Sequence, residues 1–220
     1  MSMRRTFDQE LKHLQDDILL MGSMTEKAVE RSVEALRTRD VAMAKQVIAD
    51  DAEINRTRFA IEDQCVAVIA QQQPMARDLR RITAALIIAN ELERMADHAQ
   101  GIAKINVMMG AEPLLKPLVD IPRMAEKTIE MTHAALDAFV RGDVEQAKRV
   151  ARDDDAVDAL YEQVYRELLV FMFNDPHTIT RATWLLWVAH NLERVGDRAT
   201  NICERVVYMV SGELVEYNIS

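Results

Sequence analysis

The sequence is poor in the residues that end regular structure. Its 220 residues include only six glycines and five prolines, well below the roughly 12% that is usual for these two residues together. Turn-rich sandwiches and barrels need such residues at every hairpin, so an all-β fold is excluded. Aromatic residues make up only 5% of the chain, whereas Ala, Leu, Met, Arg and Glu, which favour helices, are abundant. The composition therefore predicts a mainly helical protein.

Cysteine clusters, long apolar runs and an excess of positive charge are also missing. The two cysteines, Cys65 and Cys203, form no CxxC or His/Cys cluster, which excludes a disulfide framework and a thiolate zinc site and predicts buried thiols in a reducing cytoplasm. No apolar run approaches the ~20 residues that span a bilayer, and residues 7–10 are too polar for a signal peptide. The net charge of −9 predicts no nucleic-acid partner and no direct binding to an anionic membrane.

Apolar residues repeat at three and four positions between a few breakers, which predicts six helices. We expect them over about 7–37, after Asp40, from near Pro74, after Asp120, after Asp143, and over about 178–211. The expected buried stripe of the third helix is Leu79, Ile82, Leu86, Ala89 and then Glu93.

The two halves of the chain are related. At an offset of 100 residues, ten of the 22 positions in 81–102 are identical to those in 181–202, where chance would give one or two. Around the second and fifth helices the offset becomes 103. We therefore predict an all-α fold of two tandem, pseudo-symmetric three-helix bundles, in domains 1–112 and 118–220.

Acidic pairs occupy equivalent places in the two halves. Glu93 with Asp97, and Glu193 with Asp197, are four residues apart, so the carboxylates of each pair share one helix face. Each glutamate continues an apolar stripe and is expected to face a neighbouring helix.

The preceding helices carry matching polar residues. Asp51 interrupts an apolar seam, with Asn55 four residues later, and Asp154 and Asp158 are their equivalents. In each half, a polar residue of the earlier helix and an acidic residue of the later helix are equally distant in sequence from the turn between the two helices. Antiparallel helices bring such residues face to face, so the two sets should meet across the hairpin. The two expected groups are Asp51, Asn55, Glu93 and Asp97, and Asp154, Asp158, Glu193 and Asp197.

Converging carboxylates repel one another unless a cation lies between them. All-oxygen ligands suit hard metal ions, so the expected cofactor is a divalent or iron-type ion: Mg²⁺, Mn²⁺, iron or zinc. The first group has one charge fewer, because of Asn55, and should bind more weakly.

Other interpretations stay open. A solvated acidic helix face needs no metal. The pairs Glu10–His13 and Glu130–His133 suit a carboxylate-bridged redox enzyme, and a three-helix bundle also suits a chaperone adaptor. The chain shows no nucleophile–base arrangement, phosphate-binding glycine loop or Rossmann fingerprint, so we favour a protein that is not an enzyme.

Residues 91–97 (ELERMAD) and 191–198 (NLERVGDR) resemble the paired ERxGD signatures of the PhoU family. Residues 7–22, 73–80 and 201–204 add to the likeness, which covers nearly the whole chain. Two positions depart from the family pattern. Asn55 replaces an acid and Ala96 replaces the glycine of the first signature, so the first site is expected to be less occupied than the second.

The resemblance implies a cytoplasmic negative regulator of phosphate uptake and of the phosphate regulon. Such a protein acts as a metal-binding adaptor between the ATPase subunit of the phosphate ABC transporter and a sensor histidine kinase. It reaches the inner face of the membrane only through these partners, often as a homodimer. The family's metal positions fall on Glu93, Asp97, Asp154, Asp158, Glu193 and Asp197, and Asp51 also fits.

Overall fold

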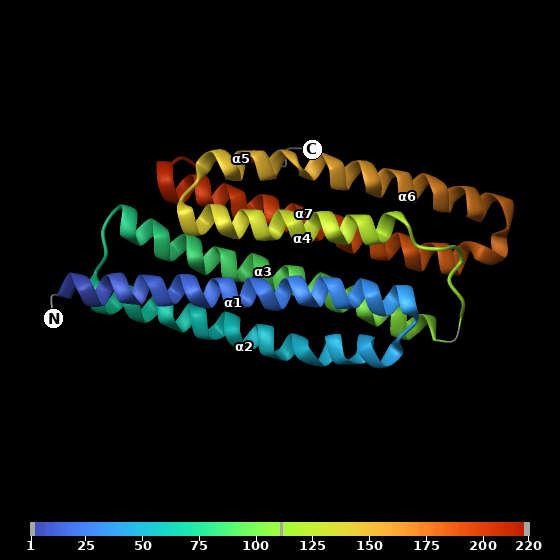
Figure 1. The fold of residues 1–220 in the computed structure, drawn as a ribbon, viewed down its shortest axis with the longest axis horizontal. Helices are drawn as coiled ribbons and strands as arrows, with labels where there is room; N and C mark the ends of the chain where they lie inside the picture. Colours follow the sequence, from blue (N-terminus) through green and yellow to red (C-terminus); the bar gives the residue numbers. More distant parts are fainter. Residues whose placement is uncertain (1–2, 111, 218–220) are drawn as a thin grey trace.

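The computed structural model describes residues 3–110 and 112–217, which form seven α-helices and one 3₁₀ helix and contain no strand. α1, α2 and α3 form one bundle, and α4, α7 and the arm made by α5 and α6 form a second (Figure 1). The predicted all-α fold of two three-helix bundles is confirmed. The elements are α1 (Met3–Thr38), α2 (Val41–Gln72), α3 (Arg77–Met109), α4 (Asp120–Arg141), α5 (Val144–Arg152), α6 (Asp154–Asn174), η1 (Pro176–Thr178) and α7 (Ile179–Ser211).

Local capping explains where several helices begin and end. The Asp40 carboxylate accepts a hydrogen bond from the backbone N–H of Met43 at the start of α2, and Asp143 does the same for Gln146 at the start of α5, each at 2.9 Å. Each cap satisfies an otherwise unpaired N–H group. Gly212, at a φ of +81°, ends α7 in the left-handed conformation that glycine adopts without strain.

Two helices differ from the sequence prediction. α3 begins at Arg77 rather than near Pro74, because Gln73 and Ala76 both have positive φ and carry the chain round the turn. Leu79 in its first turn is exposed rather than buried. The fifth helix is interrupted at Asp153, which separates α5 from α6.

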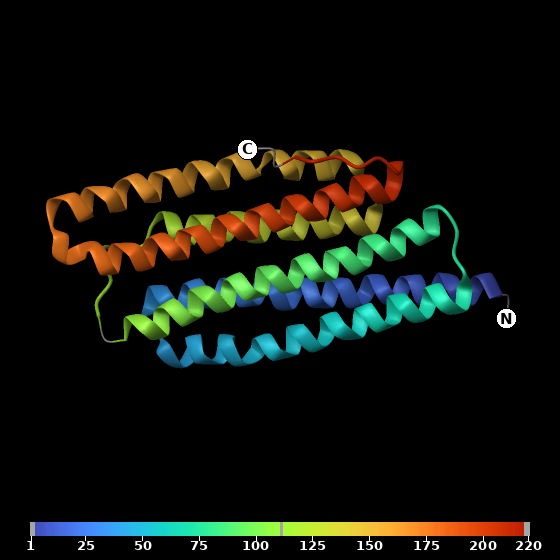
Figure 2. The same cartoon turned by 180° about the vertical axis from the view of Figure 1, so that it is seen from behind.

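The bundles pack through α3 against α7 and α1 against α4, and buried apolar residues of both belong to one continuous core (Figures 1 and 2). α3 and α7 run antiparallel. The carboxylate of Glu91 accepts hydrogen bonds from Arg198 (3.5 Å) and Asn201 (3.1 Å), while His98 Nδ1 lies 3.0 Å from Asn191 Oδ1. An offset of 100 exchanges Glu91 with Asn191 and His98 with Arg198, so these contacts straddle a pseudo-twofold axis.

The remaining sequence predictions on the fold have different outcomes. Cys65 and Cys203 are buried free thiols, as predicted. No helix within the described ranges is long and apolar enough to cross a membrane. The connection expected near 110–118 lies between α3 and α4, but residue 111 and the chain ends at 1–2 and 218–220 lie outside the described residues. The domain boundaries stay a prediction.

Candidate metal centres

An acidic hollow of about 420 Å³ lies where α6 packs against α7. α6 contributes Asp154 and Asp158, and α7 contributes Glu193 and Asp197. The structure thus brings together the four residues predicted for the second half. Tyr217, in the segment after α7, also lines this hollow.

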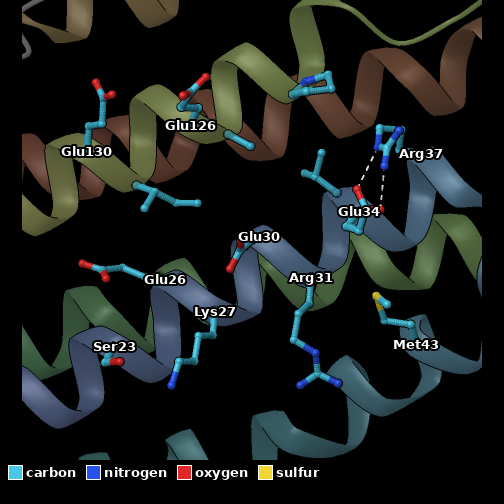
Figure 3. Close-up of a pocket in the computed structure, with 14 residues that line it drawn as sticks. Ser23, Glu26, Lys27, Glu30, Arg31, Glu34, Arg37, Met43, Glu126 and Glu130 are labelled. Carbon is cyan, nitrogen blue, oxygen red and sulfur yellow. Dashed lines mark hydrogen bonds and ion pairs between the residues drawn. The ribbon is translucent and has the colours of Figure 1, made fainter.

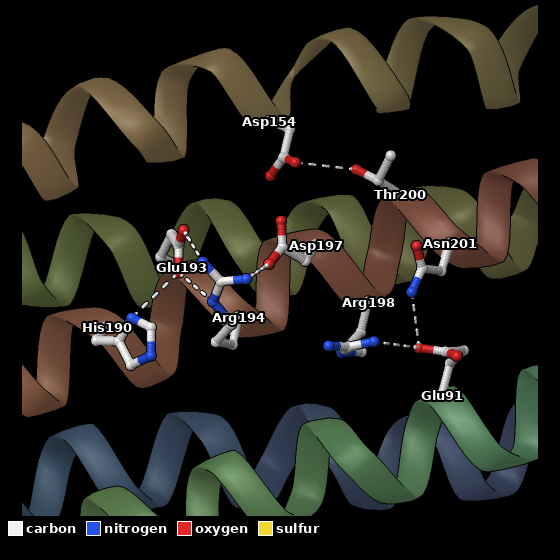
Figure 4. A network of polar contacts seen from close by, with 9 residues as sticks. All are labelled: Glu91, Asp154, His190, Glu193, Arg194, Asp197, Arg198, Thr200 and Asn201. Carbon is white, nitrogen blue, oxygen red and sulfur yellow. Dashed lines mark hydrogen bonds and ion pairs between the residues drawn. The ribbon is translucent and has the colours of Figure 1, made fainter. Parts of the chain in front are cut away.

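Asp154 is the most constrained of these carboxylates. It is only 6% exposed, and its Oδ2 accepts a hydrogen bond from the Thr200 hydroxyl at 3.2 Å, whereas its Oδ1 has no partner (Figure 4). Gly196 makes this close approach to α7 possible, because a Cβ there would lie 2.6 Å from Oδ1. A buried oxygen without a partner is costly, so the arrangement fits a cation bound at this atom.

Burial and mutual repulsion shift the acidity of the group. Burial, then the charges of Asp158 and Asp197, raises the pKa of Asp154 to about 7, although the Thr200 hydrogen bond opposes the shift. Burial also raises the pKa of Asp158 and of Glu193, and the Asp197 charge adds to both increases. The cluster therefore resists full ionisation in the absence of a cation.

The raised pKa of Asp154 predicts that the metal-free protein loses stability as the pH rises. Between the ordinary value of 3.8 and the folded value of about 7, the folded state holds a proton that the unfolded chain has released, so the free energy of unfolding falls with increasing pH. Asp154→Asn should raise that free energy by about 2–4 kcal/mol at pH 8 relative to wild type, and much less at pH 4. Urea unfolding with EDTA at both pH values measures this, with the exposed Asp155→Asn as the control. An equal gain in the free energy of unfolding at pH 4 and at pH 8 would contradict the explanation.

The Arg194 guanidinium lies between two of the carboxylates (Figure 4). Its Nε and Nη2 each donate to Glu193 at 2.7 Å, and its Nη1 lies 2.8 Å from Asp197 Oδ2. His190 approaches the other side of Glu193, with Nδ1 at 3.5 Å from Oε2. Part of the negative charge is therefore neutralised by a cation of the chain itself.

In the first bundle, Asp51 occupies the position that corresponds to Asp154. It is buried, and its Oδ1 also lacks a partner. Its Oδ2 accepts hydrogen bonds from the amides of Asn55 (3.2 Å) and Gln100 (3.0 Å). Burial, followed by the Asp97 charge, raises the pKa of Asp51. The charges of Asp51 and Asp97 therefore influence each other, and two amide groups already satisfy one oxygen of Asp51.

Glu93 has a different cationic neighbour from its counterpart Glu193. Its carboxylate lies 4.0 Å from Nε of Arg58 on α2, and burial followed by the Asp97 charge raises its pKa. Asp97 itself is exposed at the surface of α3. Arg58 is thus the cation beside Glu93, as Arg194 is beside Glu193, but no contact joins Arg58 to Asp97 within the described residues.

The side chains are not arranged around a metal ion. Over 3–110 and 112–217, no three His, Cys, Asp or Glu side chains form a group that could hold a metal ion as they lie. The unpaired, buried Oδ1 atoms of Asp51 and Asp154 nevertheless are the hard oxygen donors that Mg²⁺, Mn²⁺ and iron favour. The donor chemistry of these residues suits such an ion, and metal binding at the eight predicted positions stays a prediction.

Sequence reasoning missed several polar residues of the two groups. Gln100 and Thr200 are equivalent at the 100-residue offset, and each donates a hydrogen bond to the buried aspartate of its bundle. That repeat was the signal that could have identified them. Tyr217 follows the last helix, where no periodic pattern applies.

A second concave region, of about 960 Å³, lies between α1 and α4 (Figure 3), the helices that face the viewer in Figure 1, whereas α7 faces the viewer in the reverse view of Figure 2. Glu26, Glu30, Glu126 and Glu130 line it over an apolar floor that includes Ile129. Of the three basic side chains of α1 that line it, Arg31 pairs with Asp50 on α2 and Arg37 pairs with Glu34, whereas Lys27 extends away from the glutamates (Figure 3). The groove is therefore predominantly acidic.

Fold and site together define an all-α protein of two related three-helix repeats, each with a buried aspartate facing acidic residues of the following helix. The family model described as "PhoU domain" matches residues 18–105 and 121–206, one match in each bundle. The chain belongs to the PhoU family.

Curated relatives and solved structures agree with this membership. The chain is 38% identical to a phosphate-specific transport system accessory protein PhoU homolog of Clostridium acetobutylicum, over 98% of this chain and 99% of the relative. It is 36% identical to the PhoU accessory protein of Escherichia coli, over 94% of this chain and 86% of the relative. The crystal structure of PhoU from Pseudomonas aeruginosa superposes with a TM-score of 0.89 at 36% identity, over 94% of this chain and all of that one. The crystal structure of the phosphate transport system regulatory protein PhoU from Streptococcus pneumoniae superposes with a TM-score of 0.88 at 31% identity. The match covers 96% of this chain and 99% of that one.

Proposed function

We propose that this protein is a cytoplasmic negative regulator of phosphate uptake and of the phosphate regulon. The observation that carries the proposal is the match to the PhoU family in both bundles, with relatives named as accessory proteins of phosphate-specific transport. It acts without catalysis, as an adaptor between the ATPase subunit of a phosphate ABC transporter and a sensor histidine kinase. It reaches the membrane through these partners and forms a homodimer. Expression of the regulon in a deletion strain tests the regulatory role.

Surfaces on two sides of the molecule support an adaptor role. The acidic hollow of the second bundle opens between α6 and α7, while the acidic groove lies between α1 and α4 on the other side. One chain therefore has room to contact two partners at the same time.

The metal part of the proposal rests on the two acidic groups. A hard divalent or iron-type ion would be held by carboxylates of Asp154, Asp158, Glu193 and Asp197, and more weakly by Asp51, Glu93 and Asp97 with the amide oxygen of Asn55. The ion would supply positive charge that removes the repulsion between these carboxylates. The buried Oδ1 of Asp154, which has no partner in the chain, supports this assignment.

Protein purified without chelator should contain metal, and Glu193→Ala/Asp197→Ala should contain much less. The double variant removes two of the four carboxylates of the second hollow, so we expect its content to fall by at least half. Mass spectrometry of the metals measures this, with circular dichroism to confirm folding. The matched variant Glu93→Ala/Asp97→Ala should lose less, since the first group has one charge fewer. Equal losses in the two variants would contradict the ranking of the two sites.

A further inference from the structure

Arg194 contacts the atoms that a metal ion would need. Its guanidinium forms a bidentate pair with both oxygens of Glu193 and reaches Asp197 with a third nitrogen, at distances of 2.7–2.8 Å. Charge-assisted pairs of this geometry are among the stronger polar contacts in proteins. A metal ion and the guanidinium therefore compete for the same carboxylate oxygens.

The other arginines nearby are placed differently. Arg94, the equivalent of Arg194 in the first bundle, is exposed and makes no hydrogen bond or ion pair within the described part of the chain. Arg198 lines the same hollow as Arg194 but pairs with Glu91 across the bundle interface. The bridge from one guanidinium to two of the predicted ligands is thus particular to Arg194.

Arg194 leaves the hollow only partly neutralised. Asp154 Oδ1 keeps no partner although the guanidinium is in place. The side chain of Arg194 is 39% exposed, so it can leave the hollow for solvent, which hydrates a guanidinium readily. A cation that enters the hollow gains the oxygens that Arg194 now holds together with the one that it does not reach.

We propose that Arg194 is a resident counter-cation, and that a hard divalent cation must displace it from Glu193 and Asp197 in order to bind. This inference rests on the metal part of the proposed function. Binding of the ion and the Arg194 ion pairs are mutually exclusive, so the arginine weakens metal binding. Metal occupancy in turn decides whether a positive side chain lies inside the hollow or on the surface of α7. The hollow thereby converts the presence of an ion into a change of surface charge.

Mn²⁺ titration of three proteins tests the competition. All three carry Glu93→Gln/Asp97→Asn to weaken the first group, and they differ by having Arg194, Arg194→Gln or Arg198→Gln. Removal of the competitor should tighten Mn²⁺ binding at least about fivefold in Arg194→Gln, the lower end of typical coupling between ligands. Arg198→Gln removes the same charge from the same hollow but no contact with Glu193, so it should change the affinity by less than about twofold. A gain in affinity also cannot arise from a variant that fails to fold.

Chemical labelling of arginine in the otherwise unchanged protein tests the displacement. Phenylglyoxal should modify Arg194 faster with saturating Mn²⁺ than with EDTA, as followed by peptide mass spectrometry, while Arg198 should react at the same rate in both. The proposal is overturned if Arg194→Gln and Arg198→Gln bind Mn²⁺ alike, or if Mn²⁺ binds and leaves Arg194 labelling unchanged. Failure of every protein to bind Mn²⁺ overturns it together with the metal assignment, whereas the regulatory role is judged by gene expression alone.

Discussion

A strain that lacks this protein should express phosphate-regulon genes in high-phosphate medium as strongly as a phosphate-starved wild-type strain. In the proposed role the adaptor holds the sensor kinase inactive while phosphate is plentiful, so its loss should remove repression altogether. A reporter fused to a regulon promoter, read in high and low phosphate, measures the effect. Normal repression in the deletion strain would rule the adaptor role out.

Complementation of that strain separates the acidic hollow from the rest of the molecule. Wild-type protein should restore repression, and so should Asp137→Ala/Glu145→Ala, which removes two acids of the second bundle that lie outside the hollow. Glu193→Ala/Asp197→Ala should restore it poorly if the hollow takes part in signalling. Full repression by the last variant would leave the regulatory role intact and make the hollow dispensable for it.

Leu92→Ala should destabilise the whole protein and not only the first bundle. The Leu92 side chain is completely buried in α3, within the core that both bundles share, and truncation of a buried leucine leaves a cavity that costs about 3–5 kcal/mol. For a chain of this size the cost corresponds to a fall of roughly 10 °C in the unfolding temperature. Scanning calorimetry should show one transition in both proteins, moved as a unit in the variant.

The equivalent variant in the second bundle provides the control. Leu192 is also completely buried, and Leu192→Ala should move the same single transition by a similar amount. Two separate transitions, each sensitive to only one substitution, would show that the bundles unfold independently despite their common core.

Much of the fold follows from the sequence because helical periodicity and capping are local. The apolar seam that Asp51 interrupts follows from spacing alone, and its members Ile54, Ile61 and Val68 on α2 are buried. The buried residues of α3 were harder to predict, because this helix packs against α1, α2 and α7 together. A helix covered on several sides has no single apolar stripe, so Leu79 was wrongly placed in the core.

The site was predictable as a set of positions but not as a set of contacts. Equal distances from a hairpin turn placed Asp154 opposite Asp197, and both line the hollow. The role of Arg194 was not evident, because a solvated arginine and an ion-paired one have the same place in the sequence. Whether the Arg194 side chain points to solvent or pairs with carboxylates depends on which charged groups lie near it in the folded structure. The same holds for Arg58, whose nearest acidic neighbours, Glu62 and Glu93, lie on two different helices.

The antiparallel crossing of α3 and α7 gives one chain the symmetry of a dimer. Rotation by half a turn about the axis between these helices exchanges the two bundles, and with them α3 and α7, which lie side by side on the face shown in Figure 2. A homodimeric partner can align its twofold axis with the pseudo-twofold axis of this chain. Each of its subunits then contacts similar helices, one subunit on the first bundle and the other on the second. Differences such as Asn55 against Asp158 then decide which of its subunits meets which bundle, so a single copy can hold a symmetric assembly in an asymmetric state.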